Sequence, residues 1–319
     1  MITAEIPRVC SFQHRRVVEV QRGDMRALVD PQGGYLRRLA VTNGAGRMID
    51  VLFSHPINAK RATHGCLPFG LLESLVEGVP QKTGLYMVNG QILKLPRHGF
   101  PREQHWRWEA SREAITLRLS TLSAGNEHIL VQYPFACTLS EIVSLEADNT
   151  LRFVLGLTRH PQKAIQRFLG RQFWPVADTV PAPVNLAVHT YYTRRPAGLR
   201  LLGVDGLPYR DETTEDREAR HIFTPADGVL TDATKCDMHF PDLQGRTTTR
   251  LVYDEYDVEI TKVQGDRAAV LWNDRDEGPF TCWEELMLDR LDQFTQERGM
   301  FLYPGQSLTL EFTLRVIFH

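Results

Sequence analysis

The stretch Leu308-Thr309-Leu310-Glu311-Phe312-Thr313-Leu314-Arg315-Val316-Ile317-Phe318 alternates between apolar and polar residues. Apolar residues fill every even position, while threonine, glutamate and arginine fill the odd positions from 309 to 315. A period of two residues is that of a β-strand with one buried face. This segment therefore predicts a long strand packed against a core.

Similar patterns recur along the chain. Two strand candidates, Tyr133–Leu145 and Leu151–Leu157, flank the turn-forming cluster Glu146-Ala147-Asp148-Asn149-Thr150, which predicts a β-hairpin. Further short candidates are Met25–Val29, Gly34–Val41, Met48–Phe53, Trp106–Glu109, Ile115–Ser120, Leu199–Val204, Thr248–Tyr253, Val258–Lys262 and Ala268–Asn273. Many short strands separated by turn residues favour an all-β, antiparallel sandwich.

Helical patterns are few. Phe69–Val76 could form two turns ending at Gly78. Glu284–Arg298 is the stronger candidate, because apolar residues recur there at i, i+4 and i+7 and a glycine follows. The polar stretch Tyr209–Asp227 predicts a solvated loop. No shift in composition divides the chain, so we expect one domain over residues 1–319.

Composition excludes several classes of protein. The chain has 319 residues, 42% of them hydrophobic and 24% charged, with 37 Lys and Arg against 39 Asp and Glu. A net charge of −2 provides no overall field to attract nucleic acid or an anionic membrane. No apolar run approaches the roughly 20 residues of a membrane-spanning helix, and no secretory signal is recognisable.

Five cysteines are scattered along the sequence without a CxxC pair, at positions Cys10, Cys66, Cys137, Cys236 and Cys282. Neither a disulfide framework nor a zinc knuckle is indicated, so a reduced, cytoplasmic setting is expected. The run Cys236-Asp237-Met238-His239 holds three ligand types, but on a strand Asp237 faces away from Cys236 and Met238. A metal shared along this run is therefore not expected.

Standard catalytic motifs such as a P-loop, GxGxxG, HExxH and GxSxG are absent. Three segments nevertheless gather polar and aromatic groups: Arg97–Arg102, Ala187–Tyr192, and Leu271–Asn273 followed by Phe280–Glu284. In the last segment a carboxylate lies among aromatic and apolar neighbours. Desolvation there raises the pKa of a carboxyl group toward the range in which it can act as a general base.

All five tryptophans lie in or near these segments, namely Trp106, Trp108, Trp174, Trp272 and Trp283. Aromatic faces beside His, Arg, Asn and carboxylates suit a sugar, which offers C–H faces for packing and hydroxyls for hydrogen bonds. The alternative is that the tryptophans fill the core of a large sandwich.

The motifs resemble those of the aldose 1-epimerase (galactose mutarotase-like) superfamily. His98-Gly99-Phe100-Pro101-Arg102 with Trp106 is similar to the family's HGFAR…W motif, and Tyr133-Pro134-Phe135 to its YPF segment. Ala187–Tyr192, Trp272-Asn273 and Cys282-Trp283-Glu284 resemble the ALHTYF, VWNP and CVE segments of the hexose-6-phosphate mutarotase branch. Tyr303–Gln306 resembles the PGE turn before the last strand. The matches follow the family order over roughly residues 30 to 318. The resemblance implies an antiparallel β-supersandwich with one or two short helices.

The same resemblance implies a reaction, the interconversion of α and β anomers of an aldose. A general acid protonates the ring oxygen while a general base removes the anomeric hydroxyl proton, and no cofactor is needed. By resemblance His189 is the acid and Glu284 the base. The neighbouring Glu285 competes for the base role, but on an extended segment only one of the two carboxylates can enter the site.

Four further residues are implied to bind the substrate. His98 and Arg102 would contact hydroxyls or a phosphate, Asp237 matches a family aspartate that binds hydroxyls, and Trp272 provides an aromatic face. The expected partner is a small sugar or sugar phosphate bound by a monomer or homodimer. Six histidines without such context are expected to be structural or on the surface: His64, His105, His128, His160, His221 and His319.

The sequence departs from the phosphosugar branch at its RGGIP segment. The corresponding stretch is Thr63–Pro68, and His64 occupies the position of the arginine that helps hold the phosphate. Lys60 and Arg61 could replace it. Two alternatives to an epimerase remain. One is a non-catalytic sugar-binding or regulatory protein; the other is a divergent lyase or hydrolase, which needs a second catalytic carboxylate or a tyrosine such as Tyr191 or Tyr192.

Overall fold

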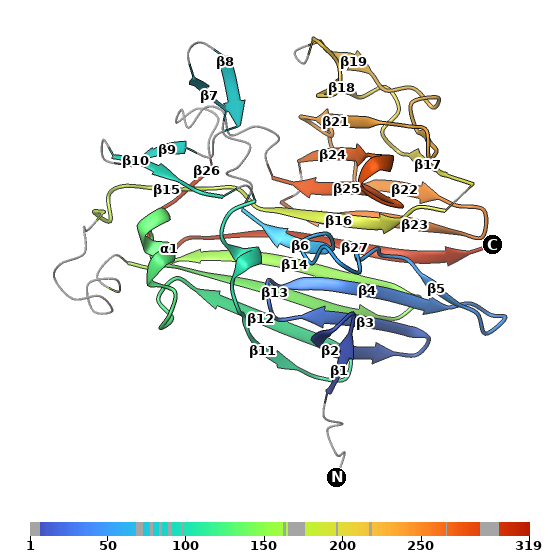
Figure 1. The fold of residues 1–319 in the computed structure, drawn as a ribbon, viewed down its shortest axis with the longest axis horizontal. Coiled ribbons are helices and arrows are strands. Elements are labelled where there is room, and N and C mark those ends of the chain that lie inside the picture. Colours follow the sequence, from blue (N-terminus) through green and yellow to red (C-terminus); the bar gives the residue numbers. More distant parts are fainter. Residues whose placement is uncertain are drawn as a thin grey trace.

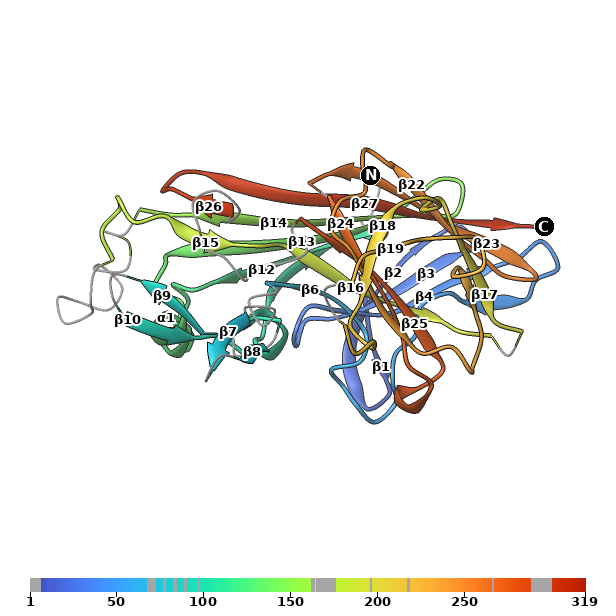
Figure 2. The same cartoon turned by 90° about the horizontal axis from the view of Figure 1, so that it is seen from above.

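The computed structural model describes residues 7–67, 73–76, 79–82, 85–88, 91–96, 98–161, 164, 176–195, 197–216, 219–265, 267–287 and 300–319. Two large antiparallel sheets dominate these residues (Figure 1). Seen from above, β12, β13, β14 and β27 run along the molecule, and β16, β24 and β25 cross them at an angle (Figure 2). The all-β antiparallel sandwich expected from the alternating pattern is confirmed.

The first sheet has nine strands and carries the long C-terminal strand near its middle. In spatial order its strands are β11 (Arg107–Ala110), β12 (Ala114–Ser120), β13 (Cys137–Glu146), β14 (Thr150–Arg159), β27 (Ser307–Phe318), β23 (Tyr256–Gln264), β22 (Thr248–Val252), β17 (Leu199–Leu202) and β20 (Val229–Leu230).

The second sheet has twelve strands. Its path is β1 (Arg8–Phe12), β2 (Arg15–Arg22), β3 (Met25–Asp30), β4 (Tyr35–Thr42), β6 (Thr63–Cys66), β16 (Ala187–Thr193), β25 (Phe280–Leu286), β24 (Ala268–Asn273), β21 (Cys236–Phe240), β18 (Pro208–Asp211) and β19 (His221–Ile222), and β5 (Met48–Asp50) pairs with β4.

Three two-stranded sheets complete the described β-structure. They are β7 (Glu73–Val76) with β8 (Val79–Lys82), β9 (Leu85–Val88) with β10 (Gln91–Lys94), and β15 (Ala182–Val184) with β26 (Met300–Leu302). Within the described ranges the named helices are all short: α1 (Glu127–Gln132) and the 3-10 turns Pro101–Glu103 and Arg275–Glu277. None of the described helices is long and apolar enough to cross a membrane.

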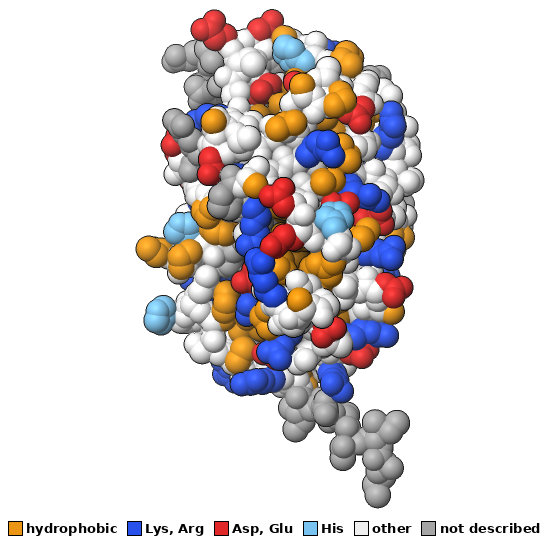
Figure 3. Space-filling view, turned by 90° about the vertical axis from the view of Figure 1, so that its right-hand side faces the viewer, with side chains coloured by type: hydrophobic (Ala, Val, Ile, Leu, Met, Phe, Trp, Pro, Cys, Tyr) orange, Lys and Arg blue, Asp and Glu red, His pale blue; other side chains and the backbone are white. Residues whose placement is uncertain are grey.

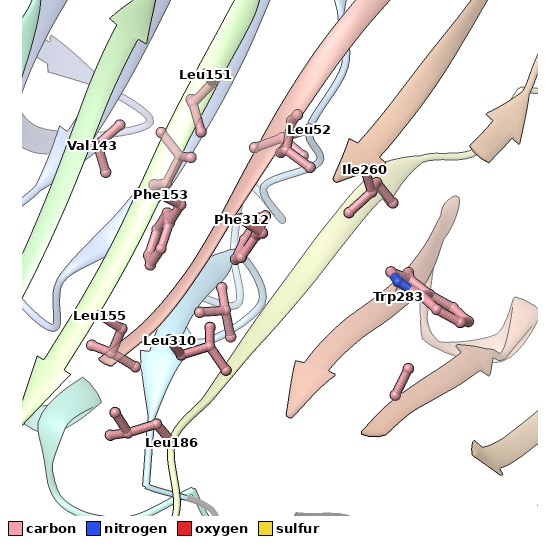
Figure 4. Close-up of a cluster of buried hydrophobic side chains, with 14 of the residues drawn as sticks. Leu52, Val143, Leu151, Phe153, Leu155, Leu186, Ile260, Trp283, Leu310 and Phe312 are labelled. Atoms are coloured by element: carbon pink, nitrogen blue, oxygen red, sulfur yellow. The ribbon is translucent and has the colours of Figure 1, made fainter. Parts of the chain in front are cut away.

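The alternation of the last strand arises from its position between the two layers. Leu310, Phe312, Leu314 and Val316 are buried, while the intervening threonines and Glu311 are only partly covered. Phe312 lies opposite Phe153 on β14, and the two rings stack with centroids 5.5 Å apart. Figure 4 shows these side chains pointing into the same cluster as Leu155, Leu310 and Trp283. The core therefore lies between the sheets.

The predicted hairpin is also confirmed. β13 and β14 pair from Glu146↔Thr150 to Cys137↔Arg159. Asp148 and Asn149 in the connecting turn have φ angles of 56° and 55°. Asp and Asn are, after glycine, the residues that adopt this left-handed region most readily, which explains the turn signal in the sequence.

The two helices expected from the sequence are wrong wherever the structure describes them. Glu73–Val76 forms strand β7, and residues 69–72 lie outside the described residues. Glu284–Leu286 ends strand β25, and residues 288–299 also lie outside. β25 pairs with β16 on one side and β24 on the other, so its backbone hydrogen bonds are committed to the sheet.

The loop predicted over Tyr209–Asp227 is wrong in part. Pro208–Asp211 and His221–Ile222 form the paired strands β18 and β19. Tyr209 and Phe223 are buried and contact Phe240 of β21 through their rings. Two aromatic anchors therefore fix the edge of the sheet although most of the segment is polar.

The surface charge follows the composition. On the face in Figure 3, Lys and Arg side chains are interspersed with Asp and Glu side chains instead of gathering in one field. Any strong electrostatic recognition on this face must therefore come from a few local charges.

Candidate active site

Five central strands of the twelve-stranded sheet place a row of side chains side by side. Register pairs align His64 (β6), His189 (β16), Glu284 (β25), Val270 (β24) and His239 (β21) across the sheet. Adjacent strands are about 4.8 Å apart, so residues from distant parts of the sequence become direct neighbours. This row lies on the sheet face opposite the core.

A cavity of about 280 Å³ opens over this row and is called the central pocket below. All six residues predicted to act on or bind a sugar line it: His98, Arg102, His189, Asp237, Trp272 and Glu284. Its volume lies near the lower end of the range for small-molecule sites, roughly 300–1,000 Å³. The structure therefore brings together every predicted site residue.

His189 and Glu284 form the polar centre of the central pocket. His189 Nε2 lies 3.1 Å from Glu284 Oε1, and the two residues are opposed in the β16–β25 ladder. Both side chains are largely withdrawn from water, with exposed fractions of 6% and 13%. An imidazole and a carboxylate at hydrogen-bond distance in a shielded cavity can exchange protons with a ligand.

The neighbouring carboxylate, Glu285, faces the other way. It is fully buried, and Thr190 Oγ1 donates a hydrogen bond of 3.4 Å to its Oε2. It does not line the central pocket, whereas Glu284 does. The expectation that only one of the two carboxylates enters the site is consistent with this alternation.

A tight turn carries His98 and Arg102 to the pocket wall. His98 and Gly99 have φ angles of +68° and +73°, and His98 O accepts a hydrogen bond from Leu67 N. A Cβ on Gly99 would lie 2.7 Å from Leu67 O, so only glycine fits. Trp106 Nε1 then donates a 3.0 Å bond to Pro101 O, which fixes the turn bearing Arg102.

Aromatic rings form another part of the wall. Tyr191 stacks on His189 with ring centroids 4.5 Å apart, and Trp272 meets His189 edge to face at 6.1 Å. The other described tryptophans belong to the core, as the alternative interpretation of the tryptophans predicts. Trp106 and Trp283 are fully buried, Trp108 packs against the core, and Trp174 lies outside the described residues. Of the four tryptophans in the described ranges, Trp272 is thus the one that lines the central pocket.

Asp237 and His239 form a second polar pair across the central pocket from Glu284. His239 Nε2 lies 3.1 Å from Asp237 Oδ1, and both residues line the cavity. His239 was not predicted as a site residue. The signal that could have revealed it is its spacing of two from Asp237, which places both side chains on one face of β21.

Three cations, Lys60, Arg61 and Arg102, also line the central pocket. Lys60 pairs with Glu103 at 2.7 Å, and Arg61 pairs with Glu277. Among the described residues Arg102 has no carboxylate partner within ion-pair distance. Lys60 and Arg61 thus line the central pocket although they precede β6 in the sequence. Because both already pair with a glutamate, Arg102 is the cation most available to an anionic ligand.

His64, expected to be structural or on the surface, is fully buried beside the catalytic candidates. Its ring centroid lies 5.6 Å from that of His189 and 5.8 Å from that of His98. Burial lowers the pKa of His64 to about 3, so the imidazole is neutral. Within the described ranges, His64, Cys66 and His98 are the group whose ligand atoms gather closely enough to hold a metal ion.

Asn273, from the matched Trp272-Asn273 pair, does not contribute to the central pocket. Its Oδ1 accepts hydrogen bonds from Arg194 and Thr281, each 2.8 Å long. It is fully buried and links β24 to Thr281 of β25 and to Arg194.

Comparison with known proteins supports the architecture. No model of a known protein family matches the chain, and no curated protein sequence matches it. Among solved structures, a protein from Synechocystis sp. PCC 6803 has a TM-score of 0.73 at 18% identity and covers 97% of this chain and 99% of its own. A galactose mutarotase related enzyme from Lactobacillus acidophilus has a TM-score of 0.72 at 14% identity, with 95% and 97% covered. Galactose 1-epimerase from Lactobacillus acidophilus NCFM has a TM-score of 0.61 at 14% identity, with 98% of each chain covered. The chain therefore has the galactose mutarotase-like fold.

Proposed function

We propose that this protein is an aldose 1-epimerase that interconverts the α and β anomers of a sugar or sugar phosphate in the central pocket. The observation that carries the proposal is the His189–Glu284 pair, with 3.1 Å between Nε2 and Oε1 and an aromatic ring and polar groups around it. A cytoplasmic location, action without a cofactor and a single domain over the chain belong to the same proposal.

The chemistry needs an acid and a base at neighbouring oxygens of the substrate. The ring oxygen and the anomeric hydroxyl are bonded to the same carbon, so the two protein groups must lie close together. Glu284 removes the hydroxyl proton while His189 protonates the ring oxygen, and the hemiacetal opens to the aldehyde. Rotation about C1–C2 presents the other carbonyl face, and the reverse proton transfers close the ring as the opposite anomer.

The rest of the central pocket suits a sugar held by its far edge. Asp237 and His239 lie two strands from Glu284, a separation of about 10 Å between strand axes. A pyranose placed over Val270 would direct its anomeric centre toward Glu284 and its opposite hydroxyls toward Asp237. Trp272 offers a face for its C–H groups, and Arg102 offers a charge to a phosphate or hydroxyl.

Anomerisation measured by polarimetry tests the proposal. Glu284→Gln should reduce the rate above the uncatalysed background by about 10²–10⁴-fold, the usual contribution of a general acid or base. The matched control is Glu285→Gln, which alters the adjacent carboxylate on the opposite face and should keep most of the activity. Equal rates for Glu284→Gln and the unmodified protein would refute the assignment. Tight sugar binding without acceleration would instead favour the non-catalytic alternative.

A further inference from the structure

Three potential metal ligands meet beside the central pocket, and one of them, His98, lines it. His64 and Cys66 project from the same face of β6, and His98 approaches from the turn after Pro96. One ligand atom from each lies within 4.8 Å of the other two. The hydrogen bond from Leu67 N to His98 O, 3.2 Å long, holds this turn against the end of β6. Imidazole and thiolate together suit Zn²⁺ or Co²⁺ better than Mg²⁺ or Ca²⁺.

His64 is prepared as a ligand by its surroundings. Its Nδ1 lies 2.8 Å from Ala62 O, and because a carbonyl oxygen only accepts, Nδ1 carries the proton. A neutral imidazole protonated on Nδ1 has a lone pair on Nε2. Nε2 is buried and has no hydrogen-bond partner among the described residues. An imidazole oriented by a backbone carbonyl through its other nitrogen is the usual arrangement of a metal-binding histidine.

The spacing of the donors is close to that of a coordinated ion. With bonds of about 2.0–2.1 Å to nitrogen and about 2.3 Å to sulfur, tetrahedral ligand atoms lie roughly 3.3–3.6 Å apart. The three donors therefore need to approach by no more than about 1.5 Å. The Cys66 thiol, which donates to Ala187 O at 3.4 Å, can turn about χ1, and His98 lies on a turn instead of a strand.

Local charge both favours and opposes such an ion. Burial, with the nearby Glu284 carboxylate, raises the pKa of the Cys66 thiol, so a bound cation must displace its proton. Glu284 also offers negative charge near the site. The Arg102 guanidinium is close enough to lower the pKa of His64 and would repel a cation.

We propose that His64, Cys66 and His98 form a binding site for Zn²⁺ or a similar thiophilic divalent cation, with its fourth position open to the central pocket. Three protein ligands with one open position are typical of accessible zinc sites. Because His98 lines the pocket, a cation bound there and a sugar compete for the same space. Cation binding itself does not depend on the proposed function; only this competition does.

Titration of the chelator-treated protein with Co²⁺ tests the site directly. The expected result is a thiolate-to-cobalt charge-transfer band in the near ultraviolet that saturates with one ion per chain and is displaced by Zn²⁺ but not by Mg²⁺. Cys66→Ser should abolish the band. His64→Gln should weaken affinity by at least about tenfold, which is what loss of even a supporting partner costs. Arg102→Gln should tighten it, because a repelling charge is removed.

Cys282→Ser is the matched control. Cys282 is buried on the same face of the same sheet and is not one of the three ligands, so the band should survive its replacement. Absence of the band at saturating Co²⁺, its persistence in Cys66→Ser, or equal loss in both serine variants would overturn the proposal.

The competition is measured separately. If the protein is an epimerase, Zn²⁺ should raise KM for the sugar without lowering kcat, and Cys66→Ser should abolish this inhibition. A protein that binds Co²⁺ through Cys66 but does not accelerate anomerisation would keep the cation site and refute the proposed function. Accelerated anomerisation without a Cys66-dependent cobalt band would keep the proposed function and refute the cation site.

Discussion

Gly99 shows how one residue without a side chain positions two residues of the central pocket. Its φ is +73°, and a Cβ at this position would lie only 2.7 Å from Leu67 O, which leaves no room for alanine. His98 precedes it and Arg102 follows three residues later, so the backbone at this point sets where both enter the central pocket.

Gly99→Ala should therefore destabilise the fold and weaken sugar binding. The left-handed conformation costs a non-glycine residue about 1–2 kcal/mol, and the clash adds to that cost. Gly23→Ala is a fair comparison, because Gly23 also has a positive φ, +54°, but nothing within 4 Å of a Cβ. Since the backbone cost is common to both variants, urea unfolding should show a larger loss for Gly99→Ala by at least about 1 kcal/mol, the lower end of the cost of overpacking. Equal losses for the two variants would show that the contact with Leu67 is unimportant.

Glu141 is a buried carboxyl on β13 that reaches across the core toward β6. A Cβ on Gly65 would lie 3.0 Å from its Oε2, and one on Gly34 would lie 3.4 Å away. Burial raises the pKa of Glu141 from about 4.5 to about 8, with a smaller opposing effect of the Gly65 backbone. The folded protein therefore holds this proton at neutral pH, whereas the unfolded chain releases it.

This proton makes stability depend on pH in a defined direction. Between about pH 4.5 and 8 the folded state binds more protons at Glu141 than the unfolded state, so the free energy of unfolding falls as pH rises. Glu141→Gln keeps the shape without the titration. It should raise the free energy of unfolding at pH 8 by more than about 1 kcal/mol, since one pKa unit corresponds to about 1.36 kcal/mol. Urea titrations at pH 5 and pH 8 would measure this, and an unchanged pH slope in the variant would contradict it.

Among the elements, β27 and β16 show what the sequence could and could not predict. β27 has one face in the core and one partly solvated face, so its alternation is visible in the sequence. β16 is buried on both faces except at its last residue, because one face packs in the core and the other forms the pocket floor. A strand covered on both sides loses the period of two. The end of β25, Glu284–Leu286, was assigned to a helix because of the apolar spacing of Met287, Leu291 and Phe294, which follow the strand.

Six residues of the central pocket were predictable for a different reason. His189, Glu284, His98, Arg102, Asp237 and Trp272 came from the order of matched motifs, and the central pocket contains all of them. His239 was missed although its spacing of two from Asp237 places both side chains on one face of β21. The place of His64 beside His189 was missed because it depends on register between strands far apart in sequence. Which residues of β21 and β6 fall in one row with Glu284 and His189 is fixed by the strand register and not by local pattern.

The layered core predicts unequal costs for neighbouring substitutions in β27. Phe312→Ala removes a fully buried ring that stacks on Phe153 and should cost about 3–5 kcal/mol. Thr313→Ala, one residue along on the other face, should stay within about 1 kcal/mol. Chemical denaturation of the two variants would compare them. Similar costs would contradict the assignment of the two faces.

At the scale of the whole molecule, positive and negative charges nearly balance, so charge can select a ligand only through individual residues of the central pocket. The net charge is −2, and acidic and basic side chains intermingle on the surface in Figure 3. Within the central pocket, Lys60 and Arg61 already pair with Glu103 and Glu277. If the substrate carries a phosphate, Arg102 is the residue expected to hold it.

Arg102→Gln should therefore raise KM for a hexose phosphate about 10- to 100-fold, which corresponds to a charge-assisted hydrogen bond of about 1.5–3 kcal/mol. The effect on the unphosphorylated sugar should be much smaller, because no full charge is lost. Steady-state kinetics with both sugars would separate the two cases. The same increase in KM for both would mean that Arg102 contacts hydroxyls and not a phosphate.

The central claim is that the pocket catalyses anomer exchange and does more than bind a sugar. Two-dimensional exchange NMR of glucose, galactose and glucose 6-phosphate in the presence of the protein measures this directly. We predict that at least one of these sugars shows α–β cross-peaks well above the uncatalysed rate, and that Glu284→Gln abolishes the excess. Saturable binding of a sugar with exchange no faster than in buffer would contradict the account.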